Sequence, residues 1–142
     1  LMRGAVPNER GNAIVEFIGA VAGLLIPALL LIVAVVRVQA ASFAAESAAV
    51  EVARTVTLAR DYEVARAGAG TIATLAFADQ SLGAPAVQIV CGQGTCTNPG
   101  ELVSVTISHA VPLLSVAGLE LGTFPISASA TSYLGAYVDR TR

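Results

Sequence analysis

The longest hydrophobic pattern in the chain is an uncharged run of twenty residues, FIGAVAGLLIPALLLIVAVV, between Glu16 and Arg37. A helix of this length measures roughly 30 Å, which matches the thickness of a bilayer hydrocarbon core. A helix inside a globular protein is rarely apolar on every side for so long. The run is also too long for the apolar part of a secretory signal peptide, and no A-x-A cleavage site follows it. The pattern predicts a transmembrane helix over residues 12–36.

The helical pattern continues after Arg37 without Gly or Pro as far as Gly68. Small and branched residues recur there at a heptad-like spacing, which predicts a packed face. The members of this stripe are Ala45, Ala49, Val52, Val56 and Ala59. We therefore expect one helix from Asn12 to Arg66, whose second half, residues 37–67, is amphipathic and lies in water. Residues 68–85 are expected to form a break followed by a short helix or loop.

Residues 86–142 show the period-two alternation that is typical of strands. Residues 87–91 form a short β-rich run, and the segments V-S-V-T-I-S and I-S-A-S-A-T alternate apolar with small polar residues. The N-P-G sequence at 98–100 predicts a turn between the first two strands, while Pro112 and Pro125 suggest strand edges or ends. The expected fold class is α+β, in which the long N-terminal helix packs on a small antiparallel sheet of three or four strands.

The chain of 142 residues is 55% hydrophobic and 13% charged, against about a quarter charged in typical globular domains. This composition excludes an intrinsically disordered chain. A net charge of −2 and scattered basic residues argue against nucleic-acid binding. We found no Ser/His/Asp order, HExxH motif, phosphate-binding loop or plausible carboxylate pair, so we expect neither an enzyme nor a cofactor.

Cys91 and Cys96 enclose the loop G-Q-G-T. A lone C-x4-C motif is a poor zinc site because zinc wants four ligands, and the single histidine, His109, is assigned to the outer side of its strand. The spacing favours a disulfide, worth about 2 kcal/mol by loop entropy, over two buried free thiols. Since disulfides persist outside the cytoplasm, the strand region should be exported. Arg3 and Arg10 ahead of the apolar run add a weak bias toward an N-in, C-out topology.

Glu16 lies in the first turn of the apolar segment, where a charge is tolerable only near the interface. One interpretation is an acid at headgroup level, favoured by the helix dipole. A second interpretation starts from Gly11, because a cut between Gly11 and Asn12 would make Glu16 the fifth residue of the mature chain. A Glu16 carboxylate buried among helices would then need a cationic partner, and the new α-amine of Asn12 is the nearest candidate.

This arrangement resembles a type IV prepilin, in which a short charged leader ends in Gly and the fifth mature residue is Glu. The segment R-G-N-A-I-V-E-F, the proline within L-L-I-P-A-L-L-L and the helix A-S-F-A-A-E-S-A-A-V-E-V-A-R are similar to TadE-like minor pseudopilins of the tight-adherence (Flp) pilus. The resemblance covers most of the chain, with its specific positions in residues 10–54. Flp-type pilins usually carry Tyr after the Glu, whereas Phe17 keeps the ring and lacks the hydroxyl.

The resemblance implies a leader over residues 1–11, cleavage after Gly11 by a prepilin peptidase, and a single-pass protein of the inner membrane. Its implied partners are the peptidase, other pilins or pseudopilins, the pilus assembly machinery and membrane lipid. Gly19 and Gly23 form a GxxxG motif that permits close helix approach, and Pro27 removes one helix hydrogen bond and can kink the span. The rival interpretation is an unprocessed single-pass membrane anchor whose exported domain binds a ligand or scaffolds a membrane complex.

Overall fold

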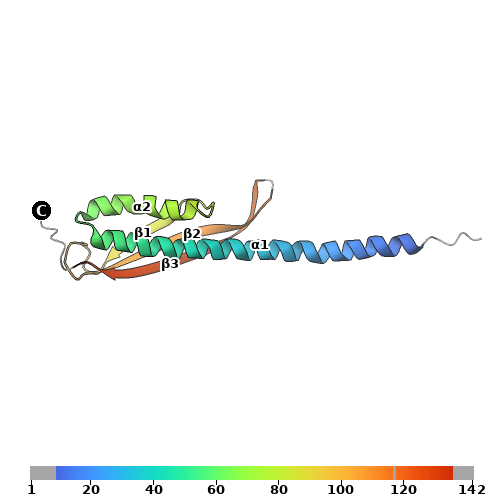
Figure 1. Ribbon diagram of the computed structural model, residues 1–142, viewed down its shortest axis with the longest axis horizontal. Coiled ribbons are helices and arrows are strands. Elements are labelled where there is room, and N and C mark those ends of the chain that lie inside the picture. Colours follow the sequence, from blue (N-terminus) through green and yellow to red (C-terminus); the bar gives the residue numbers. More distant parts are fainter. Residues whose placement is uncertain (1–8, 117, 136–142) are drawn as a thin grey trace, which may run out of the picture.

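The structure is a computed structural model that describes residues 9–116 and 118–135. Two helices precede three strands, namely α1 (Glu9–Leu58), α2 (Tyr62–Ala78), β1 (Ala86–Cys91), β2 (Leu102–Val116) and β3 (Leu119–Tyr133). The second half of α1 packs with α2 on an antiparallel sheet, while the first half of α1 extends away from the domain (Figure 1). The α+β fold class predicted from the sequence is confirmed.

The prediction of one helix to Arg66 is wrong, because α1 ends at Leu58 and a new helix begins after Asp61. The backbone of Asp61 is extended, and one carboxylate oxygen accepts hydrogen bonds from the backbone N–H groups of Glu63 and Val64 at 2.9 and 3.3 Å. This N-cap satisfies two of the donors that the start of a helix leaves without partners. The chain reverses here, and α2 runs back beside α1 (Figure 1).

The predicted break at the Gly-rich segment is also wrong, because Gly68 and Gly70 lie inside α2. Each glycine weakens a helix by about 1 kcal/mol relative to alanine, but packing of the opposite face outweighs this local cost. That face consists of residues at four-residue spacing, all of them buried: Ala65, Ala69, Ala73 and Phe77. Tertiary contacts therefore decide the conformation of this segment.

The sheet has the strand order β1-β2-β3, and both pairs are antiparallel. β1 pairs with β2 only as far as Ser108, whereas β2 and β3 remain paired out to Val116 and Leu119. Pro112 lies in the part of β2 that β1 leaves uncovered, and Pro125 lies on the edge strand β3. Both prolines thus occupy strands with a free edge, where a missing N–H is tolerated, although neither ends its strand. The described residues contain three strands and no fourth.

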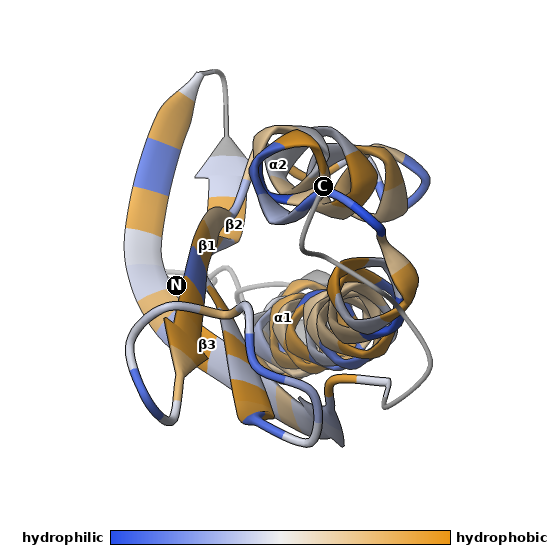
Figure 2. Cartoon of the chain, turned by 90° about the vertical axis from the view of Figure 1, so that its left-hand side faces the viewer, coloured by the Kyte–Doolittle hydropathy of each residue, from blue (hydrophilic) through white to orange (hydrophobic). Residues whose placement is uncertain are grey.

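The buried face of α1 is made mostly of alanine, whose small side chain lets the helix approach its neighbours closely. Figure 2, which looks along α1, shows both helices on one side of the sheet. Of the stripe predicted from the sequence, four residues are buried and the last is partly buried against the same core: Ala45, Ala49, Val52, Val56 and Ala59. The predicted packed face of the helix is confirmed.

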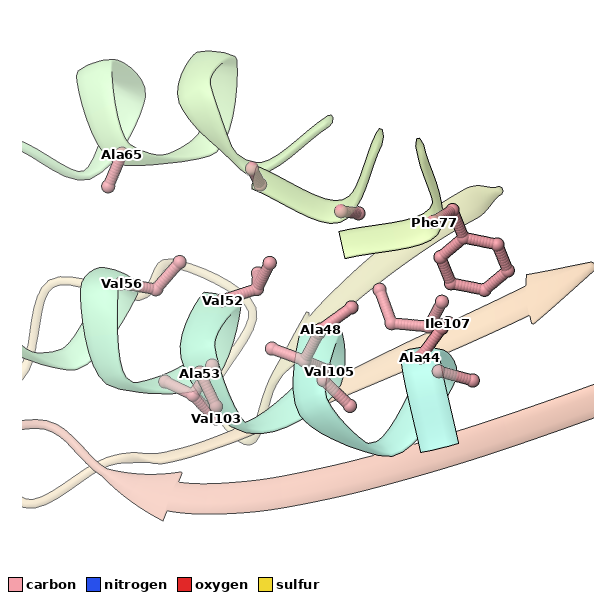
Figure 3. Packing of buried hydrophobic residues seen from close by; sticks show 14 of the residues in the cluster. Ala44, Ala48, Val52, Ala53, Val56, Ala65, Phe77, Val103, Val105 and Ile107 are labelled. Carbon is pink, nitrogen blue, oxygen red and sulfur yellow. The ribbon is translucent and has the colours of Figure 1, made fainter. Parts of the chain in front are cut away.

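Four residues from one face of β2 belong to this core (Figure 3). These residues are Val103, Val105, Ile107 and Val111. His109 falls in the same alternation, so its assignment to the outer side of the strand is wrong. Its ring meets that of Phe77 edge-on, with the ring centroids 5.2 Å apart. The histidine is therefore a packing residue between α2 and the sheet.

Candidate membrane-spanning and assembly helix

One helix among the described residues is long and apolar enough to cross a membrane, and it lies within α1. Its most apolar window is 0% buried. From residue 13 to residue 36, Ala22 and Ala34 alone are partly covered, and all other side chains are exposed. A helix that is apolar on all sides and bare on all sides is suited to lipid rather than water.

The side chains of α1 pass from exposed to buried within a few residues after Arg37. Val38 already packs against the core, and Ala41 is the first fully buried residue after Arg37. One continuous helix thus joins a bare apolar half to a half that forms the spine of the domain (Figure 1). The end of the apolar run and the start of the domain are separated by about one helical turn.

A second apolar stripe on α1 is not covered by the domain, and sequence reasoning missed it. The stripe repeats every seven residues and passes from the apolar half into the domain half: Leu29, Val36, Phe43 and Val50. Phe43 is 69% exposed and Val50 is 60% exposed, although both lie beyond Arg37. The seven-residue spacing could have been found in the sequence, because exposed heptads indicate a seam for another helix.

The residues at the head of α1 lie within one helix but are not brought into contact with the domain. Glu16 and Phe17 are exposed. Gly11 and Asn12 fall in the first turn of α1, and the side chain of Asn12 lies outside the described part of the chain. The pairing of the Glu16 carboxylate with an Asn12 amine therefore stays a prediction.

Gly19 and Gly23 lie on the bare half of α1. A Cβ atom added to either glycine would meet nothing within 4 Å. The surface around the GxxxG motif is therefore open to a partner helix. Pro27 lies inside α1, which continues through it without a sharp bend (Figure 1). The kink that the proline suggested is absent, and the carbonyl that loses its hydrogen bond belongs to Gly23, four residues earlier.

The predicted disulfide between Cys91 and Cys96 is present, and it lies at the end of the domain opposite the bare half of α1. The two Cα atoms are 5.3 Å apart, a usual separation for a disulfide. The loop closes through positive φ values at Gly94 and Cys96, of 83° and 52°. The predicted N-P-G turn follows, closed by the Glu101 N–H, which donates to the Asn98 carbonyl at 3.1 Å.

Glu101 supports this loop, and sequence reasoning did not single it out. The residue is 5% exposed, and its carboxylate accepts hydrogen bonds from the backbone N–H groups of Gln93 and Asn98. The Asn98 side chain in turn donates to Gln93 and Thr95. The backbone of Glu101 also pairs with Leu134 after the end of β3. A buried acid thus fastens the disulfide loop to the sheet.

The described residues form hollows beside the sheet. One of about 490 Å³ lies between α2 and β1, where Arg66 is the single charged group in the lining. Another, of about 380 Å³, is lined by residues that include Ser108 and His109. Within residues 9–116 and 118–135, no group of three or more His, Cys, Asp and Glu side chains is placed to hold a metal ion.

Comparison of the chain with models of known protein families, with curated proteins and with solved structures finds no match.

Proposed function

We propose that this protein is a TadE-like minor pseudopilin that takes part in the assembly of a tight-adherence (Flp-type) pilus or a related secretion pseudopilus. The observation that carries the proposal is α1 itself, one helix that is bare and apolar for its first half and packed against a small domain for its second half. This shape suits a subunit that is held in a membrane and then transferred to a helical bundle. In both places the apolar surface is kept from water.

The proposed topology places the N-terminus in the cytoplasm and the domain outside the inner membrane. The disulfide supports this orientation, because such bonds persist outside the cytoplasm. The domain begins about one turn after Arg37, so it would stand directly on the membrane surface. The arginines ahead of the span agree with this direction.

Processing by a prepilin peptidase between Gly11 and Asn12 would remove the first residues of α1. The first four N–H groups of a helix lack partners inside the helix, so this turn can unwind into a protease cleft at little cost. The same observation serves the alternative function, because a helix that begins at Glu9 is also what an unprocessed single-pass anchor would have.

Assembly would use the exposed stripe of α1. Phe43 and Val50 continue the apolar seam outside the membrane, where an unpaired monomer would leave them in water. In a bundle, the Glu16 carboxylate would pair with the Asn12 amine of a neighbour and fix the axial register, since a shift by one turn would leave both charges without a partner.

The stripe gives a direct test of the assembly role. We expect the double variant Phe43→Asp, Val50→Asp to insert, form its disulfide and keep its circular dichroism, but to lose co-purification with its pilin partners. Leu75→Asp, on the exposed side of α2, is the matched control and should co-purify as the wild type does. Undiminished co-purification of the double variant would contradict the proposal, and a wild-type protein that recovers no pilins would favour the anchor.

A further inference from the structure

The β2–β3 hairpin extends well beyond the packed core. The last buried residues toward its tip are Val111 on β2 and Ile126 on β3. Pairing of the two strands nevertheless continues to Val116 and Leu119. At about 3.3 Å per residue, the five further residues of β2 add roughly 16 Å of two-stranded arm. This arm has no third strand, because β1 pairs no further than Ser108.

The arm leaves the domain on the side from which the bare half of α1 also extends (Figure 1). On α1 the buried core begins at Ala41, only four residues after Arg37, which corresponds to roughly 6 Å along the helix. Figure 1 shows the end of the arm beyond α2, level with the part of α1 that extends away from the domain.

The tip carries exposed apolar side chains. Leu119 and Leu121 lie two residues apart on one face of the arm, and they are 68% and 53% exposed. Leu114 lies directly opposite Leu121 on the neighbouring strand, so the three leucines form one cross-strand cluster. Among the residues of β2 and β3, the acidic and basic side chains are those of Glu120 and His109. A leucine cluster on an isolated two-stranded arm is unfavourable in water.

The arm bends away from the axis of α1 near its end (Figure 1). Gly122 has a φ of 74°, which glycine adopts without strain, and its Cα faces Leu113 closely enough that an added Cβ would lie 3.5 Å from the Leu113 side chain. The bend directs the tip across the axis of α1. Since the strand edges of the arm keep unpaired backbone groups, the tip can lie at a membrane interface but not in the hydrocarbon core.

We propose that the leucine tip, formed by Leu114, Leu119 and Leu121, rests in the boundary between headgroups and acyl chains of the bilayer that α1 spans. The inference depends on the membrane span of α1 and not on pilus assembly. Apolar side chains gain free energy at this depth, and Glu120 between the leucines stays among headgroups and water. The tip and the span together would fix the tilt and rotation of the domain on the membrane.

Tryptophan placed at single positions tests this contact, because the chain has no Trp of its own. The full-length protein is reconstituted in phosphatidylethanolamine–phosphatidylglycerol vesicles with and without brominated acyl chains, which quench nearby Trp. Three variants are compared: Leu119→Trp at the tip, Leu24→Trp in the span, and Tyr133→Trp at the exposed far end of β3. We expect Leu119→Trp and Leu24→Trp to lose fluorescence with brominated lipid, and Tyr133→Trp to keep it.

The three positions separate the possible failures. If Leu24→Trp is quenched and Leu119→Trp is not, the tip inference is overturned while the span stands. If neither is quenched, the membrane span itself is wrong. Emission of Leu119→Trp that shifts to shorter wavelength without quenching would show burial against a second copy of the chain and would also overturn the lipid contact.

Discussion

The carboxylate of Glu101 accepts a hydrogen bond from the backbone N–H of Gln93 at 2.6 Å, inside the loop that the Cys91–Cys96 disulfide closes. The same carboxylate reaches the N–H of Asn98, in the turn that leads to β2. One buried acid therefore joins the loop and the turn. The disulfide and Glu101 stabilise the same segment, so the loss of either should lower the stability of the domain.

We expect Glu101→Gln to lower the free energy of unfolding of the domain by about 1–3 kcal/mol. The amide keeps one acceptor and turns a donor toward a backbone N–H, so one buried donor loses its partner. Urea unfolding of the full chain in detergent, followed by circular dichroism, measures the change. Glu120→Gln, at an exposed position of the hairpin, is the control and should stay within about 0.5 kcal/mol of the wild type. Equal stability of the two variants would show that Glu101 contributes nothing.

Cys91→Ser should destabilise the domain by about 2 kcal/mol, because the six-residue loop regains its freedom in the unfolded chain. In the native exported protein, an alkylating reagent should label no thiol until a reductant is added. The two measurements are independent, because alkylation shows whether the disulfide has formed, whereas the stability of Cys91→Ser shows how much the disulfide stabilises the domain. Complete labelling without reduction would contradict the exported location of the loop.

Glu16→Ala should still be inserted and cleaved, because neither step needs the carboxylate, but it should fail to co-purify with its pilus partners. In a bundle that excludes water, the loss of the acid leaves the amine of a neighbour uncompensated. Glu16→Asp should be intermediate, since its carboxylate is one methylene shorter. Glu46→Ala, an exposed acid further along α1, controls for charge alone. Normal assembly of Glu16→Ala would make Glu16 a simple interfacial acid.

The periodicity of apolar residues predicted those elements whose buried face appears as a repeat in the local sequence. The alternation around Val103 and Ile126 located two strands, and the Ala45–Ala59 stripe located the packed face of α1. The break before α2 was missed although Asp61 is a typical N-cap residue, because the apolar pattern on both sides suggested continuity. Gly68 and Gly70 suggested a loop, and only the packing of their opposite face keeps them helical.

Of the candidate site, the sequence predicted the features that lie within a short segment but not those that depend on how the chain folds. The apolar run and the disulfide follow from composition and spacing within a short segment. The exposed stripe through Phe43 and Val50 required knowledge of which face the domain covers. The role of Glu101 and the overhang of the β2–β3 arm depend on how distant segments align, and no local pattern of residues encodes that alignment.

The mass of the N-terminal peptide of the mature chain, isolated from cells with and without the prepilin peptidase, tests the proposed function most directly. The account predicts a mature chain that begins at Asn12 when the peptidase is present, and an uncut chain when it is absent or when the protein carries Gly11→Val. The Val side chain would occupy space beside the scissile bond that glycine, which has no Cβ, leaves free for the protease. A chain that keeps Met2 in peptidase-positive cells would contradict the account and leave an unprocessed membrane anchor.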